Sequence, residues 1–87
     1  MGIVKIFYKD ECPLCPGAKK LHKDLKGKKV NVKSYNVGTA EGLAEATFYQ
    51  IMALPAVMIE DDMENSLEEW RGTVPKIEEV LNVVCGS

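Results

Sequence analysis

The sequence lacks several features that mark specialised classes of protein. No apolar run reaches the roughly 18 residues that a membrane span needs. The N-terminus does not have the basic, apolar and small-residue regions of a secretory signal. There are no repeats, no low-complexity tract and no linker. We therefore expect the 87 residues to form one domain, residues 1–87, in the cytoplasm.

Aromatic residues are scarce, at 7% of the chain, and none lies among the lysines of "KKLHKDLKGKK", residues 19–29. This segment also has no arginine, whereas nucleic-acid sites use aromatic rings for stacking and arginine for base contacts. Its lysines at positions 19, 20, 23 and 26 lie opposite the apolar stripe of a predicted helix. We therefore expect a solvated helix face, and neither a nucleic-acid nor a membrane partner.

The chain has only three cysteines, and an odd number does not suggest a disulfide framework. Cys12 and Cys15 form a C-x-x-C pair within "FYKDECPLCPGAKKL", residues 7–21. In a reducing compartment such a pair is more often catalytic or metal-binding than structural. A zinc site usually shows a second close pair, which the remaining Cys85 and His22 do not form. The pattern favours a redox dithiol, with metal carriage through Cys12, Cys15 and a Cys85 from another subunit as an alternative.

The hydrophobic pattern predicts the element order β-α-β-α-β-β-α. Strands are expected at residues 3–8, 30–37, 55–60 and 66–71, and helices from Leu14 to a cap at Gly27, over residues 40–51 after Thr39, and from a cap at Thr73 with Pro75 in the first turn. The first β-α-β unit requires a parallel pair, and the short turn after the third strand requires an antiparallel one. This predicts an α/β fold with a four-stranded mixed sheet and three flanking helices, on both faces.

The cysteine pair lies where the first strand leads directly into the first helix. The unpaired N–H groups and the positive dipole at a helix N-terminus favour the thiolate form of Cys12. Lys9 adds a positive charge nearby, whereas Asp10 and Glu11 oppose it. Cys15 comes one helical turn later and is expected to be less exposed. Cys12 is therefore the expected attacking thiol, and Cys15 the thiol that resolves the mixed disulfide.

Other residues with reactive or aromatic side chains have simpler interpretations. His22 lies two helical turns beyond Cys15, so we expect an exposed histidine on the helix surface. Tyr8 and Trp70 lie in predicted strands and are expected to pack in or beside the core. Cys85 is expected to be a spare thiol.

Three motifs together resemble the thioredoxin–glutaredoxin superfamily: "CPLC" after the first strand, "LPAV" before the third, and "RGTVP" before the last helix. The resemblance covers essentially the whole chain. The chain resembles the short form of this fold, which is similar to glutaredoxins and to small glutaredoxin-like thioredoxins. It implies a thioredoxin-like fold and thiol–disulfide oxidoreductase activity, with no bound cofactor or metal. It also implies disulfide-containing protein substrates, and a thioredoxin-reductase-type enzyme or glutathione as electron donor. We expect a monomer.

The resemblance also implies which residues contact the substrate. In this superfamily the residue matching Pro55 is a cis-proline that faces the cysteines, and the backbone at Leu54 pairs with an extended substrate segment. Pro13 and Leu14 lie between the cysteines, and Leu14 and Leu54 would form a small apolar docking patch. The candidate substrate-binding residues are Lys9, Pro13, Leu14, Leu54, Pro55 and Gly72.

The chain departs from both parent families. Thioredoxins have a buried carboxylate where this chain has Ile6. Lys9 matches a cationic residue of glutaredoxins, but Gly72 stands alone where glutaredoxins have Gly-Gly and a nearby Asp. The pattern therefore favours dithiol exchange with proteins. A glutathione-dependent glutaredoxin and a non-catalytic binding module remain alternatives.

Overall fold

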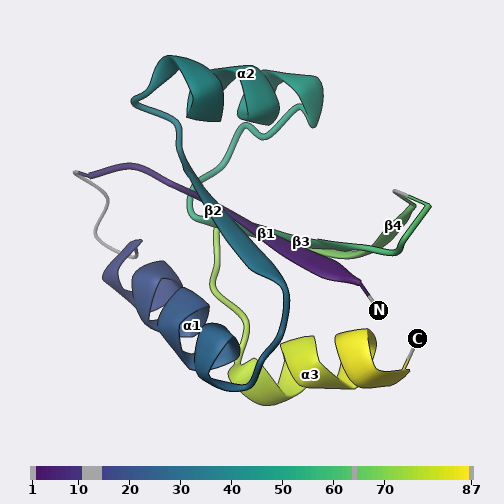
Figure 1. Ribbon diagram of the computed structural model, residues 1–87. Coiled ribbons are helices and arrows are strands. Elements are labelled where there is room, and N and C mark those ends of the chain that lie inside the picture. Colours follow the sequence, from purple (N-terminus) through teal and green to yellow (C-terminus); the bar gives the residue numbers. More distant parts are fainter. Residues whose placement is uncertain (1, 11–14, 64, 87) are drawn as a thin grey trace.

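The computed structural model describes residues 2–10, 15–63 and 65–86. They form β1 (Ile3–Tyr8), α1 (Cys15–Gly27), β2 (Val32–Asn36), α2 (Ala40–Phe48), β3 (Ala56–Glu60), β4 (Ser66–Arg71) and α3 (Ile77–Gly86). The predicted order of elements is confirmed. The sheet separates α2 on one face from α1 and α3 on the other (Figure 1). None of the helices in the described ranges is long and apolar enough to cross a membrane.

The sheet has the strand order β2-β1-β3-β4. β1 pairs in parallel with β2, and β3 pairs antiparallel with both β1 and β4. The predicted parallel first pair and antiparallel last pair are therefore both present, and β1 lies inside the sheet with a partner on each side.

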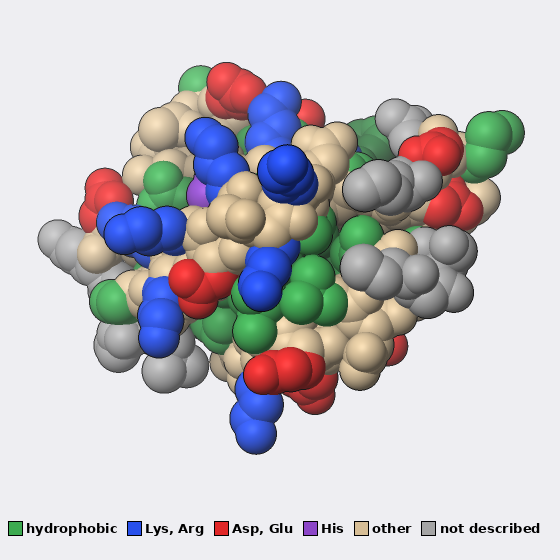
Figure 2. All heavy atoms as spheres, turned by 60° about the horizontal axis from the view of Figure 1, so that its bottom comes forward, with side chains coloured by type: hydrophobic (Ala, Val, Ile, Leu, Met, Phe, Trp, Pro, Cys, Tyr) green, Lys and Arg blue, Asp and Glu red, His purple; other side chains and the backbone are tan. Residues whose placement is uncertain are grey.

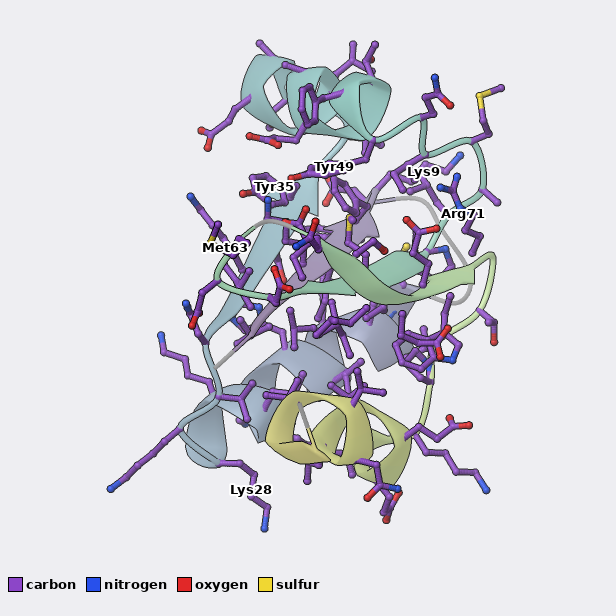
Figure 3. The ribbon with its side chains drawn as sticks, turned by 90° about the vertical axis from the view of Figure 1, so that its right-hand side faces the viewer. Lys9, Lys28, Tyr35, Tyr49, Met63 and Arg71 are labelled. Carbon is purple, nitrogen blue, oxygen red and sulfur yellow. The ribbon has the colours of Figure 1, made fainter. Side chains whose placement is uncertain are left out.

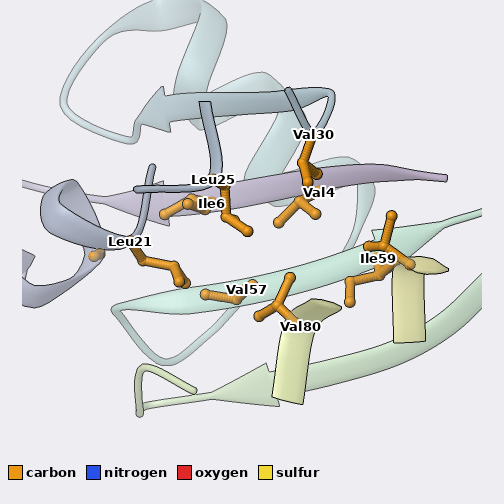
Figure 4. Packing of buried hydrophobic residues seen from close by; sticks show 10 residues of the cluster. Val4, Ile6, Leu21, Leu25, Val30, Val57, Ile59 and Val80 are labelled. Atoms are coloured by element: carbon orange, nitrogen blue, oxygen red, sulfur yellow. The ribbon is translucent and has the colours of Figure 1, made fainter. Parts of the chain in front are cut away.

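Two hydrophobic clusters lie on the two faces of the sheet, because successive strand side chains point to opposite faces. The larger cluster, under α1 and α3, consists of Val4, Ile6, Ala18, Leu21, Leu25, Val30, Val57, Ile59, Val80 and Val84 (Figure 4). Trp70 packs against it, as expected. The smaller cluster, on the α2 face, consists of Phe7, Tyr35, Ala46, Ala56 and Met58.

The C-terminal end of α1 differs from the prediction. Gly27 is its last residue, but the residue in the left-handed conformation is Lys29, with φ at 61°. The N–H of Val30 donates to the carbonyl of Leu25 at 3.1 Å, which completes a Schellman motif and brings two apolar side chains into the same cluster. Val30 therefore belongs to the turn that ends the helix, and the second strand begins at Val32 and not at residue 30.

The N-terminal end of α2 is as predicted. The hydroxyl of Thr39 accepts the N–H of Gly42 at 3.1 Å. Gly42 weakens the helical pattern in the sequence, and the structure gives the reason for a glycine there. A Cβ at this position would overlap the backbone of Asn36, so only glycine lets the helix lie this close to the end of β2.

The other end of α2 comes earlier than predicted, at Phe48 and not at residue 51. Gln50 has a φ of 56°, and the N–H of Ile51 donates to the carbonyl of Ala46 at 2.8 Å. This second Schellman motif turns the chain toward β3. The third strand begins at Ala56, one residue after the predicted start.

Thr73 does not cap the last helix, contrary to the prediction. α3 begins at Ile77, and Pro75 lies before it. The N–H of Lys76 donates to the Glu79 carboxylate at 2.8 Å, while the N–H of Glu79 donates to the Lys76 carbonyl at 3.0 Å. This reciprocal pair satisfies the helix start in the manner of a capping box, three residues later than the threonine.

A buried polar cluster lies beside the smaller hydrophobic cluster. The Lys5 ammonium is 2.8 Å from the Glu60 carboxylate and donates to the Tyr49 hydroxyl, which itself donates to Glu60 at 3.1 Å. Glu60 is only 3% exposed. Burial alone would lower the pKa of Lys5, but its bonds to Glu60 and Tyr49 outweigh burial and raise that pKa above its ordinary value. Lys5 therefore stays charged and compensates the buried carboxylate.

Truncation of a core residue tests the packing of the larger cluster. Leu25 is fully buried, so Leu25→Ala should lower the free energy of unfolding by about 2–5 kcal/mol through lost burial and a residual cavity. Denaturant unfolding measures the loss. The matched control is Leu43→Ala on α2, where the side chain is 57% exposed and the loss should be much smaller. Equal losses in the two variants would contradict the observed packing.

Removal of Lys5 tests the buried pair. Lys5→Met should cost about 3–5 kcal/mol of unfolding free energy, because it leaves the Glu60 carboxylate buried without its cation. Because the pKa of Lys5 is raised in the folded protein, the pair's contribution is complete below roughly pH 10 and is lost at higher pH. Denaturant unfolding at several pH values measures this. The difference in unfolding free energy between the parent protein and Lys5→Met should become smaller above that pH.

The control for the Lys5 variant is Glu69→Gln, which breaks the exposed Arg71–Glu69 pair and should cost at most about 1 kcal/mol. A Lys5→Met protein as stable as this control would show that the buried pair does not hold Glu60 in place.

Candidate active site

Three chain segments meet at one edge of the sheet. The register aligns Phe7 of β1 with Ala56 of β3, and Ala56 with Arg71 of β4. The residues that follow β1, precede β3 and follow β4 therefore lie at the same edge. Figure 3 shows Lys9 and Arg71 at this end of the sheet. Most of the candidate site residues from the sequence belong to these three segments.

Cys15 lies at this edge as the first residue of α1. Its side chain is only 1% exposed, and the backbone N–H of Lys9 donates to its sulfur at 3.5 Å. This bond joins the segment after β1 to the start of the helix. The Cys15 sulfur therefore lies at the positive end of the α1 dipole, beside a backbone donor, and is shielded from solvent.

Cys12, Pro13 and Leu14 lie outside the described residues, so their expected roles stay predictions. The same holds for the side chain of Cys85. In the ranges that are described, no group of three or more His, Cys, Asp or Glu side chains could hold a metal ion.

The segments before β3 and after β4 complete this edge of the sheet, with the candidate residues Leu54, Pro55 and Gly72. The Leu54–Pro55 peptide bond is cis, as the resemblance implied. Pro55 is buried, and its carbonyl accepts the N–H of Gly72 at 2.9 Å. Leu54 is half-buried and packs against the smaller hydrophobic cluster. The structure thus joins Pro55 to Gly72 and Lys9 to Cys15, and the pairing of β1 with β3 places both pairs at one edge.

Gly72 has a φ of +78°, a conformation that favours glycine. A Cβ built at this position would lie 3.5 Å from that of Ala53, which is ordinary contact. The backbone conformation, and not lack of space, therefore explains the glycine.

Nothing in the sequence singles out Arg71 and Asn36, but both hold parts of this edge. The Arg71 guanidinium donates to the carbonyl of Gln50 at 2.8 Å and so ties the loop before Pro55 to the end of β4. The Asn36 amide lies 3.4 Å from both carboxylate oxygens of Asp10. Both contacts link residues more than twenty positions apart, so no local pattern in the sequence predicts them.

Ile6 occupies the position where thioredoxins have a buried carboxylate, and the structure places it fully inside the larger hydrophobic cluster. The buried carboxylate of this chain, Glu60, is bound to Lys5 and Tyr49. Side chains alternate along β1, so Lys5 lies on the opposite face of the sheet from Ile6. Glu60 is therefore not a substitute for the thioredoxin carboxylate.

Comparison with solved structures finds thioredoxins with the same architecture. Thioredoxin 1 from Thermosipho africanus superposes with a TM-score of 0.74 and 20% identity, covering 97% of this chain and 91% of that one. Thioredoxin-2 from a malaria parasite gives a TM-score of 0.76 and 19% identity, covering 100% and 84% of the two chains. A Schistosoma mansoni thioredoxin gives 0.73 and 23% identity, covering 98% and 77%. These similarities establish the thioredoxin-like fold.

Sequence comparison places the chain more narrowly. No protein-family model matches it. A probable thioredoxin from Archaeoglobus fulgidus is 39% identical over 62 residues, which cover 70% of this chain and 68% of the relative. Together with the fold, this similarity shows that the chain belongs to the thioredoxin family.

Proposed function

We propose that this protein is a thiol–disulfide oxidoreductase that reduces disulfide bonds of other proteins with the dithiol of Cys12 and Cys15. Membership of the thioredoxin family supports thiol–disulfide oxidoreduction in general. The observation that carries the proposal is the place of Cys15, buried at the start of α1 with the Lys9 N–H on its sulfur. A shielded thiol in this position suits an internal second step better than attack on an external substrate.

The exchange proceeds in two steps. The Cys12 thiolate attacks one sulfur of the substrate disulfide and forms a mixed disulfide, and the other substrate sulfur leaves as a thiolate. Cys15, as its thiolate, then attacks the Cys12 sulfur and releases the second substrate thiolate. The substrate disulfide gains two electrons and two protons overall, while the dithiol becomes an internal disulfide. The Lys9 N–H would stabilise negative charge on the Cys15 sulfur during the second step.

The other candidate residues would position the substrate. Leu54 and Pro55 would present an extended backbone edge beside the dithiol, and Leu14 would extend the apolar patch that Leu54 begins. Pro13 would stiffen the loop between the cysteines. Gly72 would leave space for the partner's backbone, because it has no side chain and adjoins Pro55.

The partners we propose are disulfide-containing proteins, in the cytoplasm, with a thioredoxin-reductase-type enzyme or glutathione as the reductant and with this chain acting as a monomer. Gly72 stands alone where glutaredoxins have Gly-Gly and a nearby Asp to hold glutathione. This departure supports protein disulfides over a dedicated glutathione enzyme.

Replacement of the attacking thiol tests the proposal directly. Cys12→Ser should abolish insulin reduction with dithiothreitol, because serine cannot form the mixed disulfide. The rate of insulin precipitation measures the activity. Cys85→Ser is the matched control and should keep the parental rate. Full activity in Cys12→Ser would refute the mechanism, and an inactive parent protein would point to a non-catalytic binding module.

The positive charge of Lys9 provides a second test. Lys9→Gln should slow alkylation of Cys12 at neutral pH about two- to fivefold, because a nearby cation favours the thiolate form. Iodoacetamide kinetics in a Cys85→Ser background would measure it. Lys28→Gln removes an equal charge from the distant end of α1, shown in Figure 3, and should leave the rate unchanged. Equal alkylation rates in the parent, Lys9→Gln and Lys28→Gln proteins would show that the charge of Lys9 does not act on Cys12.

A further inference from the structure

We infer that a hollow between α1 and β2 binds a small oxyanion, a phosphoryl or carboxylate group. The hollow is lined by Tyr8, Lys19, His22 and Ser34 and has a volume of about 320 Å³. This volume is at the small end of the range for ligand sites, which suits a compact ligand. The inference is independent of the dithiol chemistry.

The chemistry of the lining favours an anion. All four lining side chains carry a hydrogen-bond donor, and none is a carboxylate. The Lys19 ammonium lies 5.3 Å from the centroid of the Tyr8 ring, so a cation–π contact holds the positive charge at the hollow. An anion placed here would meet the Lys19 ammonium and hydroxyl or ring donors from α1, β1 and β2.

His22 is not the exposed histidine that the sequence predicts. It is half-buried, and its Nδ1 lies 2.5 Å from the Ser34 hydroxyl oxygen. If Nδ1 accepts the serine proton, then the ring carries its proton on Nε2. If Nδ1 donates instead, the serine O–H is available to another acceptor. Either tautomer therefore leaves one donor of this pair for a ligand.

The surroundings add positive charge. Residues 1–40 carry nine lysines and three acidic residues, for a charge of +6. Lysine side chains gather over the α1 side of the molecule (Figure 2). Among the residues that the structure describes, no carboxylate forms an ion pair with Lys19. Asp24 lines a separate hollow with Val74 and Pro75, on the other side of α1. The local field therefore attracts anions to this hollow.

The experiment is an NMR titration of the full chain with inorganic phosphate, and separately with acetate, at constant ionic strength. Saturable shifts in the backbone amides of Tyr8, Lys19, His22 and Ser34 are expected. Lys19→Gln should weaken binding about tenfold, since it removes a charge-assisted hydrogen bond. Ser34→Ala should weaken it less, and both variants should keep the parental far-ultraviolet circular dichroism.

The matched control is Lys28→Gln, which removes one lysine of the same basic segment outside the hollow and should change the affinity less than twofold. Binding of phosphate but not acetate would assign the site to phosphoryl groups, and binding of both to oxyanions in general. Shifts that do not saturate, or equal weakening by Lys19→Gln and Lys28→Gln, would mean a diffuse effect of charge and would overturn the inference. If Lys19→Gln does not fold, an unchanged affinity in Ser34→Ala would overturn it.

Discussion

The structure depends on the double pairing of β1, which is parallel to β2 on one side and antiparallel to β3 on the other. Because strand side chains alternate, a slip of one residue would turn Lys5 into the hydrophobic cluster under α1 and bring Ile6 to the α2 face. The same slip would separate Phe7 from Ala56 and move the end of β1 away from the start of β3. The register of this one strand therefore sets both the core and the edge where the candidate site lies.

The candidate site lies at that edge because three chain segments meet there. The chain leaves β1 at Tyr8, and the next N–H, from Lys9, reaches the sulfur of Cys15 at the start of α1. Across the sheet, Pro55 and Gly72 are bonded to each other where β3 begins and β4 ends. The helix dipole and the Lys9 donor favour negative charge on sulfur, while burial limits access to Cys15. This combination supports the proposal that Cys15 is the resolving thiol.

The sequence predicts the parts of the fold that have a local cause. The apolar stripe of α1, at its described positions, and the cap at Thr39 are confirmed, because periodicity and capping act over a few residues. The helix ends are less predictable, since non-glycine residues at Lys29 and Gln50 adopt the left-handed conformation. Contacts between distant segments, such as His22 with Ser34, have no local signature at all. For the candidate site, the dithiol stays a prediction, and the cis bond before Pro55 is confirmed. The Arg71 bond that holds the loop before Pro55 has no signal in the sequence.

Trapping of the mixed disulfide tests most directly whether Cys12 is the attacking thiol and Cys15 the resolving thiol. In a Cys85→Ser background, a Cys15→Ser protein incubated with a disulfide substrate should accumulate a covalent adduct through Cys12, because no second thiol is present to resolve it. A Cys12→Ser protein in the same background should form none, since its one remaining sulfur, at Cys15, is buried. Mass spectrometry after non-reducing digestion identifies the linked cysteine. An adduct through Cys15 in the Cys12→Ser protein, or none through Cys12 in the Cys15→Ser protein, would contradict the account.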